Sequence, residues 1–364
     1  MSTATAVREH APAFDNARSE AFLGKFLGAM NNAAMILMIS VGHRTGLFDT
    51  LATASPCTSA ELAKASGHAE RYVREWLSVL AMSGVVDYDR TDRRFTLPAE
   101  HAAWLTRAAA PNNVAVNAQF ISVIAGVEDE IVEHFHDGHG VHYHEYGRFH
   151  DVMGEHTGQN IVMNLIDRIL PLVDGGIEAL ERGIDVVDVG CGAGGALLLL
   201  AETYPRSRFT GIDLCAPAFE KAQADAARRG LTNLTFKELD IGTVTTLGAY
   251  DIVLAFDAVH DQPDPQEMLR TVRRSLKPGG TYLMVDIGGS SVLEKNLDHP
   301  LGAYLYAVST MHCTPVSLAQ GGIGLGTMWG VEMASEMLFQ AGFGKVQMTR
   351  HPHDPFNAYF VARV

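Results

Sequence analysis

Two patterns of apolar residues alternate along the second half of the chain. From residue 184 onward, short β-branched runs alternate with segments in which apolar residues recur every three or four positions. The runs predict strands and the segments predict helices. The predicted strands are IDVVDVG, RFTGID, LTFKELDI, YDIVLAF and TYLMVDI, followed by a closing antiparallel pair, KVQMTRH and NAYFVARV. This order predicts an α/β fold, with a mainly parallel sheet covered on both faces and ligands beyond the carboxyl ends of its strands.

A different pattern occupies residues 46–106. One helix is expected to begin at Thr58 or Ser59 and to end at Gly67, and a second to run from about residue 70 to residue 83. The sequence VVDYDRTDRRFTL then predicts two short strands around a polar turn. Two helices followed by such a hairpin predict a winged helix.

Composition bears on the function of this winged helix. The chain has 42 acidic and 28 basic residues, a formal net charge of -14, so phosphate backbones and anionic membranes repel it. The basic residues of the second helix also alternate with acidic ones. We therefore favour a dimerisation and substrate-covering module over a DNA-binding one, and expect no nucleic-acid or membrane partner.

The amino-terminal segment and the cysteines indicate a cytoplasmic protein. Residues 1–15 lack the apolar core of a signal peptide, and Lys25, Asn31 and Asn32 interrupt the apolar stretch 21–40. That stretch predicts a buried helix better than a membrane span. The four cysteines are scattered and form no CxxC pair, which argues against disulfides and a zinc ribbon.

The middle of the chain contains a histidine-rich segment. Seven of the 16 histidines fall within residues 133–156, and glycines interrupt any regular helix there. Either these histidines are solvated, or one or two of them overhang the active site together with Tyr146 or Arg148. The expected domains are a helical and winged-helix domain (1–110), a helical linker carrying this loop (111–183) and a ligand-binding domain (184–364) with a lid insertion (288–329).

A glycine-rich turn, VVDVGCGAGG, follows the first strand of the sheet. Gly190 and Gly192 allow the backbone to turn tightly and to approach a ligand at a helix N-terminus, and Asp188 precedes them. Asp213 ends the second strand, where a carboxylate can accept both hydroxyls of a ribose. Asp240 ends the third strand, where it can bind the amino group of an adenine.

At these motifs, and at SLKPGGTYLMVDI before the final hairpin, the chain resembles class I S-adenosylmethionine (SAM) methyltransferases over residues 184–364. The resemblance implies a Rossmann-like seven-stranded sheet with an antiparallel last strand. The winged helix matches a bacterial subgroup in which this domain supports dimerisation, so a homodimer is expected. By resemblance, the cofactor-binding residues are Asp188, Gly190 and Gly192 at the methionine end, Asp213 and Leu214 at the ribose, Asp240 and Ile241 at the adenine, and Phe256 and Asp257 beside the cofactor.

His260 and Asp261 follow the fourth strand directly past the expected cofactor position. Methyl transfer from a sulfonium needs proximity and the removal of a proton, so a neutral histidine here is most simply a general base. The long insertion adds His312, next to Cys313. Two histidines and a carboxylate, His260, His312 and Asp261, can hold a divalent or ferrous ion with open positions. We rank Cys313 below them because a thiolate favours a closed zinc site.

This stretch resembles the bacterial metal-dependent α-keto acid C-methyltransferases of nonribosomal peptide (antibiotic) pathways, which hold a metal through paired histidines. The resemblance implies a Zn or Fe ion at His260 and His312, which would stabilise an enolate at the β-carbon of a small α-keto acid. Arg148 is a candidate clamp for the substrate carboxylate. Two alternatives stay open: a metal-free O- or N-methyltransferase with His260 as base, and a winged-helix SAM-sensing regulator.

Overall fold

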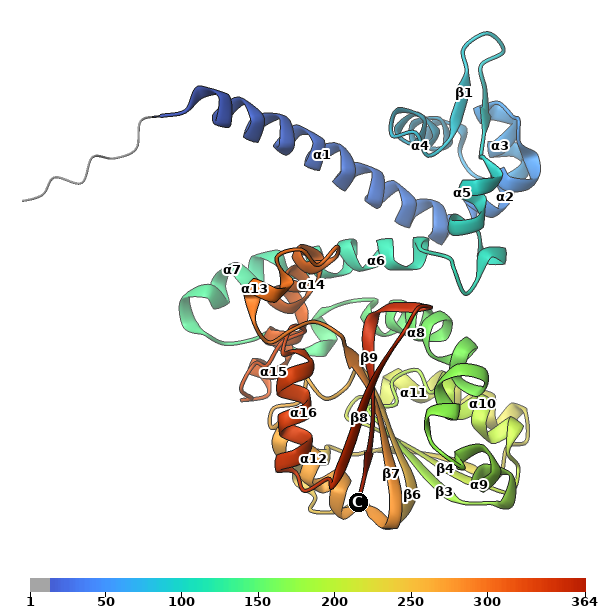
Figure 1. Ribbon diagram of the computed structural model, residues 1–364. Coiled ribbons are helices and arrows are strands. Elements are labelled where there is room, and N and C mark those ends of the chain that lie inside the picture. Colours follow the sequence, from blue (N-terminus) through green and yellow to red (C-terminus); the bar gives the residue numbers. More distant parts are fainter. Residues whose placement is uncertain (1–13) are drawn as a thin grey trace, which may run out of the picture. The chain divides into compact units, whose positions relative to one another are not determined.

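The computed structural model describes residues 14–364, which form two compact units that divide between Arg107 and Ala108 (Figure 1). The expectation about a signal peptide falls almost entirely on residues outside this range. The first unit is helical, with one small hairpin. Its elements are α1 (Asn16–Thr45), α2 (Leu47–Ala54), α3 (Ser59–Ser66), α4 (Glu70–Met82), β1 (Asp87–Asp89), β2 (Arg94–Thr96) and α5 (Ala99–Leu105).

The predicted winged helix is confirmed, and local chemistry explains its boundaries. Thr58 and Glu61 form a capping box: the Thr58 side chain accepts from the Glu61 backbone N–H at 3.2 Å, and Glu61 accepts from the Thr58 N–H at 2.8 Å. Gly67 ends α3 in the left-handed conformation. β1 and β2 pair antiparallel as the wing, with Tyr88 opposite Phe95.

Both arginines of α4 are paired with acidic side chains of the same helix. Arg74 lies 2.7 Å from Glu70 on α4, and Arg71 forms an ion pair with Glu75 one turn further along. These pairs leave α4 with little unpaired positive charge for a phosphate backbone.

The α1 helix is confirmed, but its predicted burial is wrong. The buried residues of this 30-residue helix are Ile39, Ser40, Gly42 and His43, and all four lie near its carboxyl end. By length and apolar composition the helix could cross a membrane, although only 6% of its most apolar window is buried. The amino-terminal part of α1 therefore presents apolar side chains that no other described element of the first unit covers.

The second unit contains the predicted seven-stranded sheet. The strand order is β5-β4-β3-β6-β7-β9-β8, and β9 runs antiparallel to both of its neighbours. This arrangement confirms the Rossmann-like methyltransferase sheet. The strands are β3 (Asp185–Val189), β4 (Arg208–Asp213), β5 (Leu234–Glu238), β6 (Tyr250–Phe256), β7 (Leu276–Ile287), β8 (Lys345–His351) and β9 (Asp354–Arg363).

Alternation along the strands fills two hydrophobic cores, one on each face of the sheet. Val186 packs into one core and Val187 into the other, as successive residues of a strand must. α9 (Gly176–Arg182), α10 (Gly195–Thr203) and α11 (Ala216–Arg228) cover the first face. α12 (Pro265–Arg274) and α16 (Gly330–Gln340) cover the second (Figure 1).

Two further segments lie beside this sheet. The segment before β3 is mainly helical, as predicted, and the insertion after β7 is helical rather than a structureless loop. Both lie near the same end of the second unit (Figure 1). Their main helices are α6 (Ala115–Ile124), α7 (Glu128–Asp137), α8 (Phe149–Asn160), α13 (Leu293–Asn296), α14 (Gly302–Val308) and α15 (Thr314–Ala319).

Candidate functional site

A cavity of about 330 Å³ lies at the carboxyl ends of β3, β4, β5 and β6. Residues of the helical segment, the sheet edge and the insertion all line it. The structure brings every predicted cofactor residue to this one cavity. They are Asp188, Gly190, Gly192, Asp213, Leu214, Asp240, Ile241, Phe256 and Asp257.

The glycine-rich turn after β3 leaves no room for a side chain at Gly190. A Cβ at Gly190 would lie 2.4 Å from the Cβ of Ala258, and Gly190 has φ +70°. Asp188, in front of it, is 1% exposed, and its Oδ1 has no hydrogen bond with any described residue. Burial first, and then the charge of Asp213, raises the pKa of Asp188 to about 8. A buried acceptor without a partner suits a cationic ligand group.

Asp213 and Asp240 bind local backbone and also face the cavity. Asp213 accepts hydrogen bonds from the N–H groups of Gly192 at 2.8 Å and Cys215 at 2.9 Å. Asp240 accepts from the Gly242 N–H at 2.8 Å. A carboxylate has about four lone-pair sites, so each retains acceptor capacity for hydroxyl or amino groups of a ligand. Their role in capping turns and their proposed role in ligand binding are therefore compatible.

His260 forms a buried pair with Asp286, the next-to-last residue of β7. The Nδ1 of His260 lies 2.6 Å from Oδ1 of Asp286, and both side chains are almost fully buried. Trp329 Nε1 donates to the same carboxylate oxygen at 3.0 Å. This contact orients the imidazole, as in a histidine–carboxylate base pair, and leaves Nε2 on the side of the ring that faces Asp261. Burial lowers the pKa of His260, but the charges of Asp286 and Asp261 outweigh it and hold that pKa well above 6.5.

Asp261 lies on the other side of the same imidazole. Its Oδ1 is 3.3 Å from His260 Nε2, and its Oδ2 accepts from the Tyr143 hydroxyl at 2.9 Å. Tyr143 comes from the histidine-rich loop, 118 residues away in sequence. The histidine-rich segment therefore contributes to the cavity through two of its histidines, His150 and His156, as one of the two interpretations expected, whereas Tyr146 does not line it. It also contributes Tyr143, which the sequence did not single out.

The predicted metal ligands come together only in part. Ligand atoms of His260, Asp261 and Cys313 lie within 4.8 Å of one another, so Cys313 occupies the third position instead of His312. His312 also lines the cavity, stacked on Phe149 with ring centroids 3.8 Å apart. Its Nε2 is buried without a hydrogen bond to any described residue, and burial lowers its pKa to about 4. The histidine is thus neutral and adjacent to the cluster.

Arg148 does not line the cavity, so the structure gives no support to a substrate-carboxylate clamp at this position. Its Nη1 donates to the Gln119 side chain at 3.2 Å instead. Phe120 lines the cavity, whereas Trp329 donates a hydrogen bond to Asp286 from the core. Tyr304, Val308 and Phe356 add apolar lining.

Asp286 and Tyr143 are the site residues that the sequence did not reveal. An acid at the end of an otherwise apolar strand, as in TYLMVDI, is a usable signal for Asp286 because an unpaired carboxylate is expensive to bury. Tyr143 has no such signal, since a tyrosine is common in a loop of mixed polarity.

Two family models match the chain. Residues 33–107 match an Rv2258c-like winged helix-turn-helix domain, and residues 180–341 match a methyltransferase domain. The chain therefore combines a winged-helix domain with a methyltransferase domain. This agrees with the SAM-binding arrangement expected at the carboxyl edge of the sheet.

Individual relatives extend the comparison. The chain is 33% identical over 102 residues to a ubiquinone biosynthesis O-methyltransferase of Albidiferax ferrireducens, covering 27% of this chain and 39% of the relative. It spans less than half the length of this curated relative. Among solved structures, mitomycin 7-O-methyltransferase has a TM-score of 0.65 at 20% identity, covering 96% of this chain and 100% of the other. Human N-acetylserotonin methyltransferase, solved with SAM, has a TM-score of 0.65 at 16% identity, covering 97% and 99%. These likenesses establish the shared fold.

Proposed function

We propose that the protein is a SAM-dependent O-methyltransferase of a small molecule. The observation that carries this proposal is the shared cavity, which joins the Asp188–Gly192 turn and the Asp213 and Asp240 carboxylates to the His260–Asp286 pair. The methyltransferase domain match, and the O-methyltransferase and SAM-bound names among the relatives, support the same reading. A regulator that only binds SAM has no evident need for a buried histidine–carboxylate base beside the cofactor position.

The proposed reaction is an in-line displacement. His260 Nε2 removes the proton of a substrate hydroxyl as its oxygen forms a bond to the methyl carbon. The carbon–sulfur bond of SAM breaks, and its electron pair stays on sulfur. Asp286 keeps the imidazole oriented and stabilises the imidazolium that forms. Apolar lining such as Phe120 and Tyr304 favours a small, largely apolar substrate held close to the methyl group.

A substrate screen tests the proposal directly. Consumption of SAM is measured with small phenols and alcohols, and in parallel with phenylpyruvate and branched 2-oxo acids, each with and without a chelator. Turnover of hydroxyl substrates that survives chelation is the expected result. Turnover restricted to 2-oxo acids and abolished by chelation would instead select the second candidate function described next.

Buried groups near His260 favour that second candidate, metal-assisted C-methylation of an α-keto acid. Asp261 Oδ1 and His312 Nε2 are both buried without hydrogen bonds to described residues, and His260, Asp261 and Cys313 have the proximity of a ligand set. These residues would hold a divalent ion, which supplies Lewis-acid stabilisation of an enolate. Metal analysis of untagged protein, and of a His260→Ala/Cys313→Ser variant, tests it; wild-type protein that takes up no metal would remove this candidate.

The pH dependence of the reaction provides a further prediction. The base must be unprotonated, and its neighbours raise the pKa of His260 well above 6.5. The rate should therefore rise with pH, with a midpoint well above 6.5. Asp286→Asn removes the nearest charge, so the midpoint should move to lower pH while the maximal rate falls by at least about tenfold, because the ring loses its orientation. A pH–kcat/KM profile of both proteins measures this; superimposable midpoints would exclude His260 as the base.

We also propose that the protein forms a homodimer through α1. Leu23, Phe26, Met30 and Leu37 are each at least 40% exposed, and their spacing of three, four and seven residues follows a coiled-coil seam. A second copy of the same helix can bury this seam. A partner helix would cover all four of these side chains. Insertion of α1 into a membrane would instead place the charged Lys25 in the membrane interior.

The dimer prediction uses matched double variants. Phe26→Glu/Met30→Glu introduces charges into the seam and should convert dimer to monomer in size-exclusion chromatography with light scattering. Lys25→Glu/Asn32→Glu changes exposed positions of α1 outside the seam and should leave the dimer intact. A wild-type monomer, or equal masses for the two variants, would refute the assignment.

A further inference from the structure

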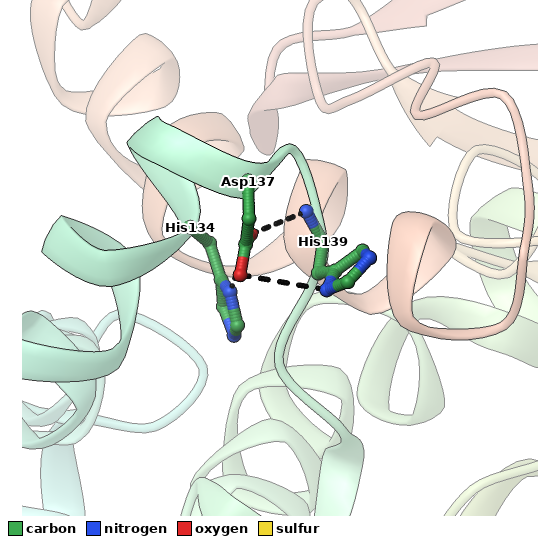
Figure 2. Close-up of side chains that lie close together, drawn as sticks. All are labelled: His134, Asp137 and His139. Atoms are coloured by element: carbon green, nitrogen blue, oxygen red, sulfur yellow. Dashed lines mark hydrogen bonds and ion pairs between the residues drawn. The ribbon is translucent and has the colours of Figure 1, made fainter.

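Three metal-ligand side chains converge at the carboxyl end of α7 (Figure 2). None of the three lines the cavity described above. His134 lies in the last turn of α7 and Asp137 is its final residue. Gly138 ends the helix in the left-handed conformation, and the chain turns so that His139 faces the same carboxylate. The end of the helix therefore brings the three ligands of the sequence HxxDxH together.

The geometry of this cluster matches a metal site. His134 Nδ1 lies 3.0 Å from Asp137 Oδ1, and His139 Nδ1 lies 3.4 Å from Asp137 Oδ2. Zinc–nitrogen and zinc–oxygen bonds of about 2.0–2.1 Å at tetrahedral angles place neighbouring ligand atoms about 3.3 Å apart. One ligand atom from each of the three side chains lies within 4.8 Å of the other two, so an ion can enter once side-chain rotation brings these atoms closer together. Two imidazoles and one carboxylate form the ligand set that borderline divalent metals prefer.

Electrostatics and access favour a cation at the same place. The last carbonyl groups of a helix carry a partial negative charge, and Asp137 adds a full one. The His134 side chain is 23% exposed, that of Asp137 46% and that of His139 78%, so an ion and its remaining water ligand reach the site from solvent.

From this geometry we propose that His134, Asp137 and His139 bind a zinc-class divalent ion, with water completing the coordination. The site is distinct from the His260 cluster and does not depend on the proposed methyltransferase activity. The proposed role of the ion is structural, because it would link the end of α7 to the loop that follows.

The tethered loop leads into the cavity. A Cβ on Gly140 would lie 1.9 Å from the carbonyl oxygen of Pro315, so the loop backbone lies directly against α15. Val141 is fully buried, and Tyr143 then donates to Asp261. Binding an ion at residues 134–139 should hold residues 138–145 in place, and with them the tyrosine that contacts Asp261.

The test is a zinc titration of untagged, metal-stripped protein by calorimetry. Loss of one ligand in His139→Ala should weaken binding to this site at least about tenfold, since even outer-shell changes cost 10- to 100-fold. His136→Ala is the matched control: His136 is exposed on the same helix, about 200° around it from His134, and its removal should change nothing. Zinc bound at the His260 cluster survives both changes, so the difference between the two isotherms isolates the surface site.

Hydrogen exchange gives a second measurement that is independent of activity. Zinc should slow amide exchange across residues 138–145 in the wild type and in His136→Ala, but not in His139→Ala. Magnesium, which prefers oxygen ligands, should have no such effect. Identical titrations of wild type and His139→Ala would overturn the proposal, as would a loss of binding that follows His142→Ala/His144→Ala instead.

Discussion

Replacing His260 with alanine should lower kcat by about 100- to 10,000-fold, the usual contribution of a positioned general base. Asp286 binds the Nδ1 of the almost fully buried imidazole at 2.6 Å and orients it, so the substitution removes the proposed base together with its positioning. SAM affinity should stay unchanged, because the predicted cofactor contacts come from other side chains. Steady-state kinetics and calorimetry with SAM measure the two effects separately.

Rescue by imidazole in solution distinguishes a base from a packing residue. The alanine variant leaves a space the size of the missing ring, and added imidazole should restore part of the rate in proportion to its unprotonated form. A His260→Ala enzyme that retains most of the wild-type rate would disprove the assignment. A variant that loses SAM binding and rate together would indicate a structural role.

Replacing Asp213 with asparagine should weaken SAM binding tenfold to a hundredfold, because the neutral amide binds the ribose hydroxyls less strongly than the carboxylate does. Hydrogen bonds to a charged acceptor contribute about 1.5–3 kcal/mol, and each 1.4 kcal/mol is tenfold in Kd. Asp213 also accepts from Gly192 and Cys215, so the glycine turn itself should loosen. Calorimetric titration with SAM, alongside thermal unfolding, separates a decrease in affinity from a decrease in stability.

Glu220→Gln provides the control for Asp213→Asn. Glu220 is exposed on α11, the helix that follows β4, and the same change of charge there should leave SAM affinity intact. Equal affinities in wild type and Asp213→Asn would remove Asp213 from the cofactor site.

The elements of the fold follow closely from the sequence because their causes are local. Alternation of apolar residues predicts the strands, the Thr58–Glu61 capping box begins α3, and Gly67 ends it. The cofactor edge is predictable for a similar reason. Parallel strands bring their carboxyl ends to one edge, so Asp188, Asp213 and Asp240 meet without any knowledge of side-chain packing.

The exposure of α1 shows where such reasoning fails. Its apolar composition predicts burial, but burial depends on what covers a helix, and no element of the first unit within residues 14–107 covers the amino-terminal part of α1. We propose that a second copy of the chain covers this part of α1. The periodicity of one sequence can suggest such a partner, but the structure of one chain does not contain it.

The catalytic arrangement depended on tertiary structure. His260 is visible in the sequence as a polar residue after the fourth strand, but its partner Asp286 is 26 residues away on a neighbouring strand. Tyr143 reaches Asp261 across 118 residues, and the turn of the insertion brings Cys313 within ligand distance where His312 was expected. Sequence periodicity sets which face of an element a residue occupies. Only the packing of distant elements decides which side chains share a buried space, and hence which proton the histidine can take.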